Sequence, residues 1–437
     1  MKKDQISFFS AISIVIGSVI GSGVFMKPAR VIDAMGSTNG AIIAWVLGGA
    51  IALLGALTLA EISARIPRVG GIYTYAEEIY GKGFGFTSGW IISVIYAPAL
   101  NGGIALYLAS LTAQFFELAD TVVVPLAVMA LIILTIISCI RTSWGVFLQN
   151  TTTLGKFVPL IAITAGGLFL GNHEAFNITV PDPSGLAPAG LGVAMLATFW
   201  AYDGWSQVCS LGDEVKEPAK NLPKVFIYGV LIIMLVYVLI NIAIVKAVPA
   251  AEIVSLNERA ASVAAERLFG VWGGKLVSLG MIVAILGAVN ANILTLPLVT
   301  YSMARNKLFP ASKLLGKTSK TDTPANSIIF QTLLSIFMVL FLNVDSITDI
   351  AMFSMYVFNS CIFIGLFKLR RRDQGLKNKE IYRVPLYPFV PLLAIIGSLY
   401  VCYSMFANSP YDALGAIIVA ALGFPIYKVL TKNQASL

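Results

Sequence analysis

Charged side chains are scarce in this sequence of 437 residues: they make up 12% of the chain, whereas 57% of it is hydrophobic. Soluble globular domains carry about 25% charged residues. The sequence therefore has too few polar groups to cover a water-soluble body of this size. The mean hydropathy of +0.84 points instead to an integral membrane protein.

Histidine and cysteine are also scarce, and their scarcity argues against several kinds of chemistry. The only histidine is His173, and the four cysteines, Cys139, Cys209, Cys361 and Cys402, lack the spacing of metal ligands. A zinc site and a histidine-based catalytic triad are therefore not expected. Since no other acid–base or nucleophile constellation stands out, we expect no enzyme, no metal and no cofactor.

What the sequence does contain is long apolar runs. An α-helix needs about 20 apolar residues to cross a bilayer, whereas a barrel strand needs about 10 residues of alternating pattern. Twelve runs meet the helical requirement, at about 8–35, 40–65, 84–113, 121–140, 144–170, 188–212, 223–248, 271–304, 325–342, 346–368, 385–405 and 410–430. The predicted fold is an all-α integral membrane protein with 12 transmembrane helices and no soluble domain.

The net charge of +8 reflects lysine and arginine residues that gather in the loops on one side of these runs. Loops rich in these residues stay in the cytoplasm. We therefore expect a multi-pass protein of the cell membrane with both termini cytoplasmic, and the charge requires no nucleic-acid partner. Near the inner end of the second run, Glu61 and Arg65 have the i, i+4 spacing of a helical ion pair.

Two of the apolar runs are interrupted near their middle. The first, "AISIVIGSVIGSGVFMKPARV" at 11–31, contains three glycines within 17–23, and each loosens a helix by about 1 kcal/mol relative to alanine. The sixth, "ATFWAYDGWSQV" at 197–208, contains an Asp-Gly pair at 203–204. Broken segments at corresponding positions of two halves indicate an inverted-repeat transporter with a site at the membrane midplane.

A broken helix frees backbone groups that only protein or a water-filled cavity can satisfy at membrane depth. A half-helix that restarts near Gly23 presents unpaired N–H groups, which suit a carboxylate, and Ser22 adds a hydroxyl. The half-helices that end near Val19 and Trp200 present carbonyl groups, which suit an ammonium. Together these groups match the zwitterion of an α-amino acid.

The glycines of the first run fit two other interpretations, helix packing and a phosphate-binding loop. "GSVIG" fits the G-x-x-x-G pattern of closely packed membrane helices, and taken alone the run favours packing. The matching break in the sixth run shifts the balance towards a binding site. A phosphate-binding loop is rejected because no G-K-[ST] sequence follows the glycines.

Four segments resemble the amino acid–polyamine–organocation (APC) transporters, within them the L-type amino acid transporter (LAT) branch, and there the bacterial-type exchangers. They are "IGSVIGSGVFMKP" in the first run, "WAYDGW" in the sixth, and "GDEVKEPAKNLPK" and "YSMARNKLFP" beyond. The resemblance implies the LeuT-type fold, with inverted repeats at 8–170 and 188–368 and two additional helices at 385–430. It also implies sodium-independent transport of amino acids.

The resemblance further implies a set of substrate contacts. The substrate carboxylate would meet Ser22 and Gly23 with Gly21 supporting the turn, and the ammonium would meet the carbonyls of Val19, Trp200 and Asp203. The Trp200 ring would form an aromatic gate over the substrate.

Asp203 stands where many relatives have a small residue, which leaves its role open. Its carboxylate either faces the pocket and favours polar or cationic substrates, or caps a helix that restarts near Trp205; aspartate is a good N-cap residue.

Lys156 lies inside the fifth run, where a charge costs about 2.5 kcal/mol or more. It either snorkels to the inner surface or, as the resemblance implies, replaces a sodium ion and bridges the fifth run to the first break.

Two further polar residues lie in apolar runs. Tyr237 is expected to hydrogen-bond near the first broken helix and to act in gating or coupling, and Asn359 is expected to line the pocket. Satisfaction inside the core is an equally good account of each, since buried polar groups normally find partners.

The sequence is compatible with three functions. The first is alternating-access exchange of small or medium neutral L-amino acids; the second is proton-coupled transport of cationic amino acids or polyamines, which Lys156 disfavours. The third is an amino-acid sensor or channel, but no filter loop or signalling domain is apparent.

The loop "AQFFELADT" lacks the cysteine through which animal L-type relatives bind a heavy subunit. We therefore expect a monomer with amino acid substrates and membrane lipids as its partners, and no disulfide-linked heavy subunit.

Overall fold

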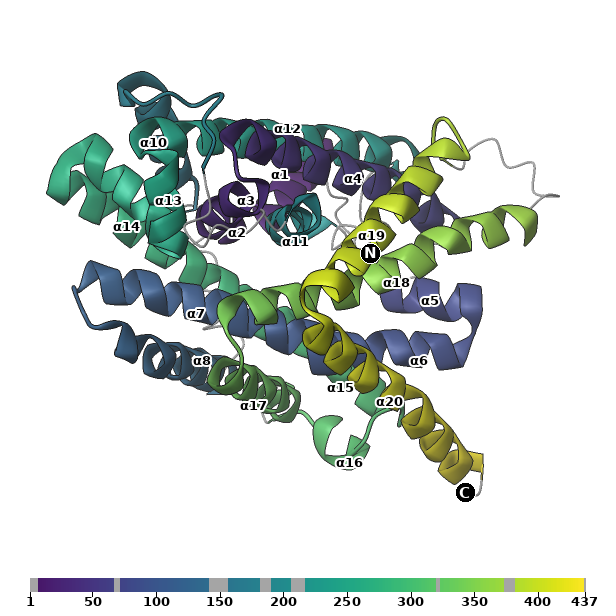
Figure 1. The fold of residues 1–437 in the computed structure, drawn as a ribbon. Helices are drawn as coiled ribbons and strands as arrows, with labels where there is room; N and C mark the ends of the chain where they lie inside the picture. The colour runs from purple at the N-terminus through teal and green to yellow at the C-terminus, as the bar shows by residue number, and fades with distance from the viewer. Residues whose placement is uncertain are drawn as a thin grey trace.

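The computed structural model describes residues 7–66, 71–140, 156–180, 190–205, 217–319, 323–372 and 382–435. Over these ranges the regular structure is helical, and the sole strand-like pairing is an isolated bridge between Ser37 and Thr179. In Figure 1, α4 lies beside α12, and α7 lies beside α8 in a separate layer. The chain is thus an all-helical protein.

Eight helical segments in the described ranges are long and apolar enough to cross a membrane, and a ninth if the bent pair at the start counts as one span. The eight are α4 (Thr38–Arg65); α6, η1 and α7 (Lys82–Ile91, Ile92–Tyr96, Ala97–Phe115); η2 and α8 (Asp120–Val122, Val123–Ile140); α12 (Pro218–Ala247); α13, η4, α14 and α15 (Ala250–Leu256, Asn257–Arg259, Ala260–Thr295, Pro297–Arg305); α18 (Val344–Arg372); α19 (Phe389–Asn408); and α20 (Pro410–Ala435).

Three shorter apolar helices accompany them: α10 (Phe157–Leu170), α11 (Leu191–Tyr202) and α17 (Ala325–Phe341). The predicted run at 144–170 extends on one side into residues outside the described ranges, and the run at 188–212 does so on both sides. Two further short helices are α5 (Gly71–Tyr80) and α16 (Ser312–Leu315).

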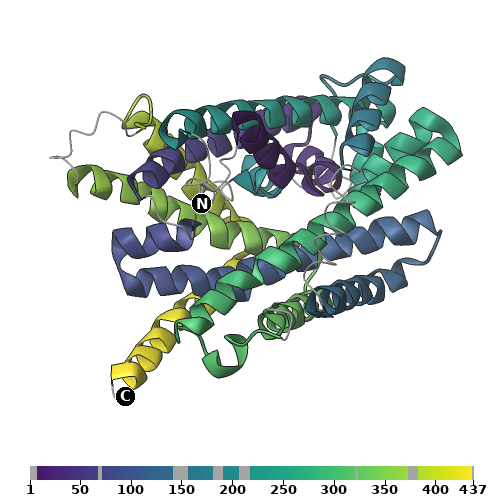
Figure 2. The ribbon, with the colours of Figure 1, turned by 180° about the vertical axis from the view of Figure 1, so that it is seen from behind.

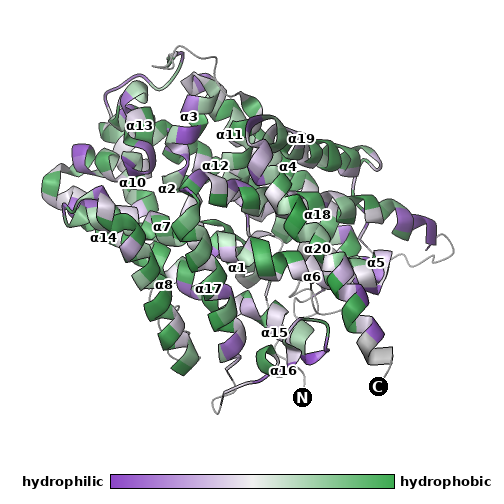
Figure 3. Ribbon diagram, turned by 60° about the horizontal axis from the view of Figure 1, so that its bottom comes forward, coloured by the Kyte–Doolittle hydropathy of each residue, from purple (hydrophilic) through white to green (hydrophobic). Residues whose placement is uncertain are grey.

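The helices differ in how much of their apolar surface is covered by protein. Each span has a most apolar stretch, and the buried share of that stretch varies. It is 89% in the span that contains α7 and 78% in α18, but only 28% in the span that contains α8 and 17% in α20. Figure 3 shows apolar residues along the outward-facing helices. Since lipid tails are as apolar as leucine, these exposed faces fit a bilayer. Seen from behind, α14 crosses the molecule diagonally, in contact with α7 and α10 (Figure 2).

The first predicted interruption is present as a break in the helix. The chain forms α1 (Phe8–Val19), leaves the helix at Ile20–Ser22, and resumes as α2 (Gly23–Met26) and α3 (Pro28–Met35). The direction changes by 61° between Ala11–Met26 and Pro28–Met35. A proline at the first position of α3 suits this restart. The N–H group at this position has no partner within a helix, so a proline there loses no hydrogen bond.

The second interruption begins where α11 ends at Tyr202. Asp203 is extended (φ −67°, ψ 153°), and Gly204 adopts φ +112°, a conformation that favours glycine. A Cβ on Gly204 would lie 2.6 Å from the Ser18 carbonyl oxygen, so this position also admits the close approach of α1. The helix that we expected to restart near Trp205 lies outside the described residues.

At the far end of α4, the predicted pair of Glu61 and Arg65 is confirmed, with Arg65 Nε 2.9 Å from Glu61 Oε1. The completely buried Glu61 also accepts two hydrogen bonds from Arg370 of α18, at 2.8 and 2.6 Å, and one from the Val384 N–H at 2.7 Å. A buried carboxylate needs such partners, and removing one typically costs about 3–5 kcal/mol. Glu61 therefore joins α4, α18 and the segment before α19.

Candidate substrate-binding site

A cavity of about 420 Å³ lies where the two helix breaks meet. Both breaks, α7, α14 and the residue before α10 contribute to its wall. It is lined by Ser13, Ile14, Gly17, Ser18, Val19, Ile20, Gly21, Ser22, Gly23, Leu100, Ile104, Lys156, Trp200, Asp203, Gly204, Ala288, Ala291 and Asn292. All the predicted site residues except Tyr237 and Asn359 lie in this lining.

The donor side of the cavity is the segment Gly21–Gly23. The N–H groups of Phe25 and Met26 bond to the Ser22 carbonyl at 3.1 and 3.0 Å, whereas no described acceptor takes the N–H groups of Gly21, Ser22 or Gly23. The Ser22 hydroxyl makes no capping bond. Unpaired donors at membrane depth are tolerated where a cavity meets them, so this segment can receive an anionic group.

The acceptor side is organised by Tyr237 of α12. Its hydroxyl lies 3.0 Å from the Val19 carbonyl oxygen and 2.9 Å from the Ala201 carbonyl oxygen. A tyrosine hydroxyl carries one proton, so it donates to one of these carbonyls at a time. Tyr237 is completely buried behind the cavity and links the carbonyl ends of α1 and α11.

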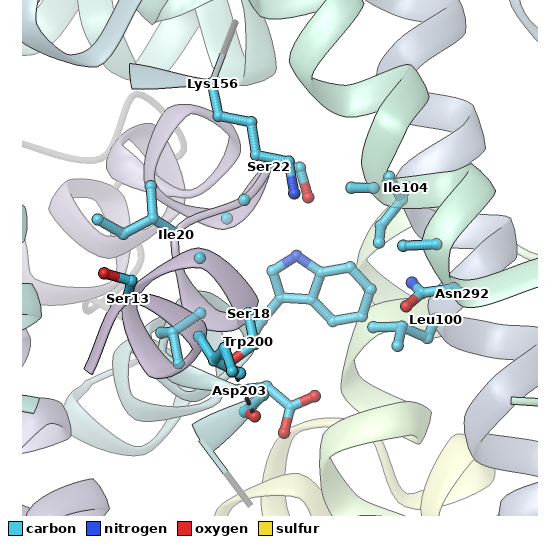
Figure 4. A pocket seen from close by; sticks show the side chains of 18 residues that line it. Ser13, Ser18, Ile20, Ser22, Leu100, Ile104, Lys156, Trp200, Asp203 and Asn292 are labelled. Atoms are coloured by element: carbon cyan, nitrogen blue, oxygen red, sulfur yellow. Dashed lines mark hydrogen bonds between the residues drawn. The ribbon is translucent and has the colours of Figure 1, made fainter. Parts of the chain in front are cut away.

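Trp200 and Asp203 form the end of α11 that faces the cavity. Figure 4 shows the Trp200 ring projecting into the space between Ser22 and Leu100. Asp203 accepts a hydrogen bond from the Tyr96 hydroxyl, which comes from the π-helical turn η1. The carboxylate therefore has a protein partner on a different helix, which neither of the two roles predicted for Asp203 included.

Lys156 is 7% exposed and extends into the cavity towards Ser22 (Figure 4). Among the described residues, none makes an ion pair or hydrogen bond with its ammonium group. The cavity therefore contains the Lys156 amine beside the donor segment Gly21–Gly23, and the Lys156 side chain does not run along the outer surface of the helix bundle.

Similarity to known proteins identifies the family of this chain. The family model described as amino acid permease matches residues 6–426. This chain belongs to that family. The transporter is 41% identical over 435 residues to the serine/threonine exchanger SteT of Bacillus subtilis, covering 99% of this chain and 98% of the relative. It is 28% identical to the mouse large neutral amino acids transporter small subunit 2, over 97% of this chain and 80% of the relative.

A third relative, the mouse b(0,+)-type amino acid transporter 1, is 26% identical over 97% of this chain and 87% of its own length. The protein is therefore a multi-pass amino acid transporter and not an enzyme, and the predicted membership of the APC family with L-type relatives is confirmed.

Asn359 of α18 does not line this cavity of the transporter. It is 4% exposed, and its Oδ1 has no hydrogen-bond partner among the described residues. The asparagine that does line the cavity is Asn292 of α14. Both asparagines lie in apolar helices, so residue type alone did not distinguish them. What distinguishes them is which side of its helix each one occupies, and whether that side faces α1 and α11.

A cluster of four charged residues beyond the first break was not predicted at all. Lys27 Nζ lies 2.9 Å from Asp345 Oδ1 and 3.0 Å from Thr348 Oγ1, and Lys27 is only 1% exposed. Arg30 of α3 lies 2.8 Å from Asp345 Oδ1 and binds both oxygens of Asp349, at 2.8 and 2.5 Å. The signal available in the sequence was the pair of cations in "MKPAR", three positions apart on one helical face.

Proposed function

We propose that this transporter exchanges small neutral amino acids, serine and threonine in particular, across the cell membrane without sodium. The relative that is 41% identical over nearly the whole chain is named as a serine/threonine exchanger. The observation that carries the proposal is the cavity between the two breaks, where the unpaired N–H groups of Gly21–Gly23 lie beside the buried Lys156.

The zwitterion of the substrate would span the cavity. Its carboxylate would accept hydrogen bonds from the donor segment Gly21–Gly23 and the Ser22 hydroxyl, and its ammonium would meet the carbonyls of Val19, Trp200 and Asp203. The Val19 carbonyl has two lone pairs and can accept from the substrate and from Tyr237 together. Trp200 would close over the bound substrate.

The substrate side chain would point to the opposite wall. Leu100 and Ile104 make that wall apolar, and Asn292 adds one polar group that can bond a substrate hydroxyl. Asp203 offers a carboxylate in the same cavity, but Tyr96 already donates to it. A carboxylate with a protein donor attracts a cationic side chain less, which favours neutral substrates over the cationic alternative.

Lys156 would act in place of a coupling cation. Its ammonium would bridge the fifth span to the first break, which supports transport without sodium. The position of the ammonium group near Ser22 favours this role over snorkelling.

The conformation fits an alternating-access cycle. The cavity extends along α1 past Gly17 to Ser13, whereas beyond the other end of the break Lys27 and Arg30 bind α18. If both termini lie in the cytoplasm, as we propose, this would be an inward-facing state in which the charged cluster closes the outer side.

We further propose that α10, α11 and α17 complete a set of 12 spans. Residues 8–170 and 188–368 would form the inverted repeats of a LeuT-type fold, and 385–430 would add two helices. The transporter would work alone, without a disulfide-linked heavy subunit.

Counterflow in proteoliposomes tests the function. Vesicles preloaded with L-threonine should take up labelled L-serine equally well with and without sodium, and vesicles preloaded with L-lysine should take up much less. Uptake into empty vesicles that requires a pH gradient would instead support the proton-coupled alternative.

A further inference from the structure

Two adjoining hollows lie far from the substrate cavity, around the connection from α15 to α17. One is an apolar groove of about 340 Å³ between α6, α16 and α17, and the other is a pocket of about 610 Å³ between the α15–α16 segment and α20. Phe309 and Ala311 line both of them. In Figure 3, α15 and α16 lie at the same end of the molecule as the last turns of α20.

The pocket is strongly basic. Arg305, Lys307, Lys313 and Lys317 line it, and no acidic residue does. The described residues place no carboxylate within ion-pair distance of Arg305, Lys313 or Lys317. These three are therefore available to an anion from outside the protein.

Other basic residues at this end of the protein are engaged differently. Arg65 and Arg370 bind Glu61, and Arg372 lies 3.2 Å from Glu78. A general excess of positive charge in cytoplasmic loops accounts for exposed cations, but it does not require that unpaired ones surround a single hollow.

The groove offers almost nothing polar. Phe309 stands between Trp90 and Phe330, with ring centroids 5.5 and 5.7 Å apart. The Trp90 Nε1–H donates to the Val419 carbonyl at 2.9 Å, and the Asn326 amide donates to the Leu314 carbonyl at 2.8 Å. Because its polar groups are engaged in this way, the groove suits a hydrocarbon chain.

We propose that the two hollows together bind one anionic phospholipid of the surrounding membrane. Arg305, Lys313 and Lys317 would hold the phosphate of its headgroup, and an acyl chain would lie along the groove past Phe309. Basic pockets between membrane helices are suited to anionic headgroups. An apolar groove that opens from such a pocket matches the remaining part of the same molecule.

The test measures lipid bound to the purified full-length transporter in detergent, by native mass spectrometry with added phosphatidylglycerol or phosphatidylcholine. We expect the transporter to retain phosphatidylglycerol preferentially. The combined variant Arg305→Gln, Lys313→Gln and Lys317→Gln should retain at least tenfold less phosphatidylglycerol and an unchanged amount of phosphatidylcholine.

A matched variant controls for loss of charge alone. Arg371→Gln, Lys428→Gln and Lys432→Gln removes three exposed cations that do not line the pocket, and it should bind phosphatidylglycerol like the unaltered protein. Equal loss in both variants, equal retention of the two lipids, or displacement of the lipid by millimolar inorganic phosphate would overturn the proposal. If the triple variant fails to fold, Leu333→Trp fills the groove from its exposed side and should also lower phosphatidylglycerol retention.

Discussion

Gly23→Ala tests whether the two helix breaks must touch for the site to form. In the structure a Cβ on Gly23 would lie 2.5 Å from Ala201 Cα and 2.9 Å from Ala201 Cβ. Carbon atoms in contact normally stand about 3.5–4.0 Å apart. Since the nearest obstacle is the backbone of α11, one added methyl group should push the two segments apart by roughly 1 Å.

The expected magnitude follows from the cost of overpacking. Extra atoms in a well-packed interior typically cost about 1–3 kcal/mol. If the substrate binds only when the breaks are in contact, the same energy appears as a loss of affinity, which amounts to about 5–150-fold. Alanine itself favours helix over glycine, so helix propensity cannot explain a loss.

Equilibrium binding of labelled L-serine to the purified protein measures the effect. Gly415→Ala in α20 is the control, because a Cβ on Gly415 meets no atom within 4 Å. Gly23→Ala should weaken binding while keeping normal membrane insertion, and Gly415→Ala should leave binding unchanged. An affinity of Gly23→Ala within twofold of the unaltered protein, or an equal loss in the control, would show that substrate binding does not depend on contact between the two breaks.

Three further predictions follow from the cavity. Lys156→Ala should reduce counterflow at least tenfold while leaving the size-exclusion profile of the protein normal; normal exchange rates would contradict its coupling role. Tyr237→Phe leaves the carbonyls of both breaks without their donor, at a cost of about 1–3 kcal/mol, and should lower thermal stability. Tyr107→Phe should not, because the Tyr107 hydroxyl is buried with no partner among the described residues. Tyr96→Phe frees the Asp203 carboxylate and should raise L-lysine uptake relative to L-serine uptake; an unchanged ratio would remove Tyr96 from specificity.

Several features of the fold could be predicted because they depend only on local sequence. The helical membrane class follows from run length and the scarcity of charge, and the break after Val19 follows from the clustered glycines of the first run read together with the matching interruption in the sixth. The pair of Glu61 and Arg65 was predictable as well, since four positions along one helix fix its geometry.

The partners of the site residues could not be predicted in this way. Tyr96 and Asp203 are 107 positions apart, and Tyr237 and Val19 are 218 apart. Each contact requires two helices to pack in one particular rotation. The sequence shows that a polar residue lies in an apolar helix, but not which neighbour it faces.

Local sequence is enough to show that this chain crosses a membrane as helices and that regular helix stops after Val19 and after Tyr202, and it predicts a ligand site near Gly23. The packing of the helices was needed to show that the breaks meet at Ala201, and that Lys27 binds Asp345 from 318 positions away. The difference lies in the sequence separation over which the interactions act. Hydropathy and helix propensity act between neighbours along the chain, whereas ion pairs and close packing form wherever folding brings surfaces together.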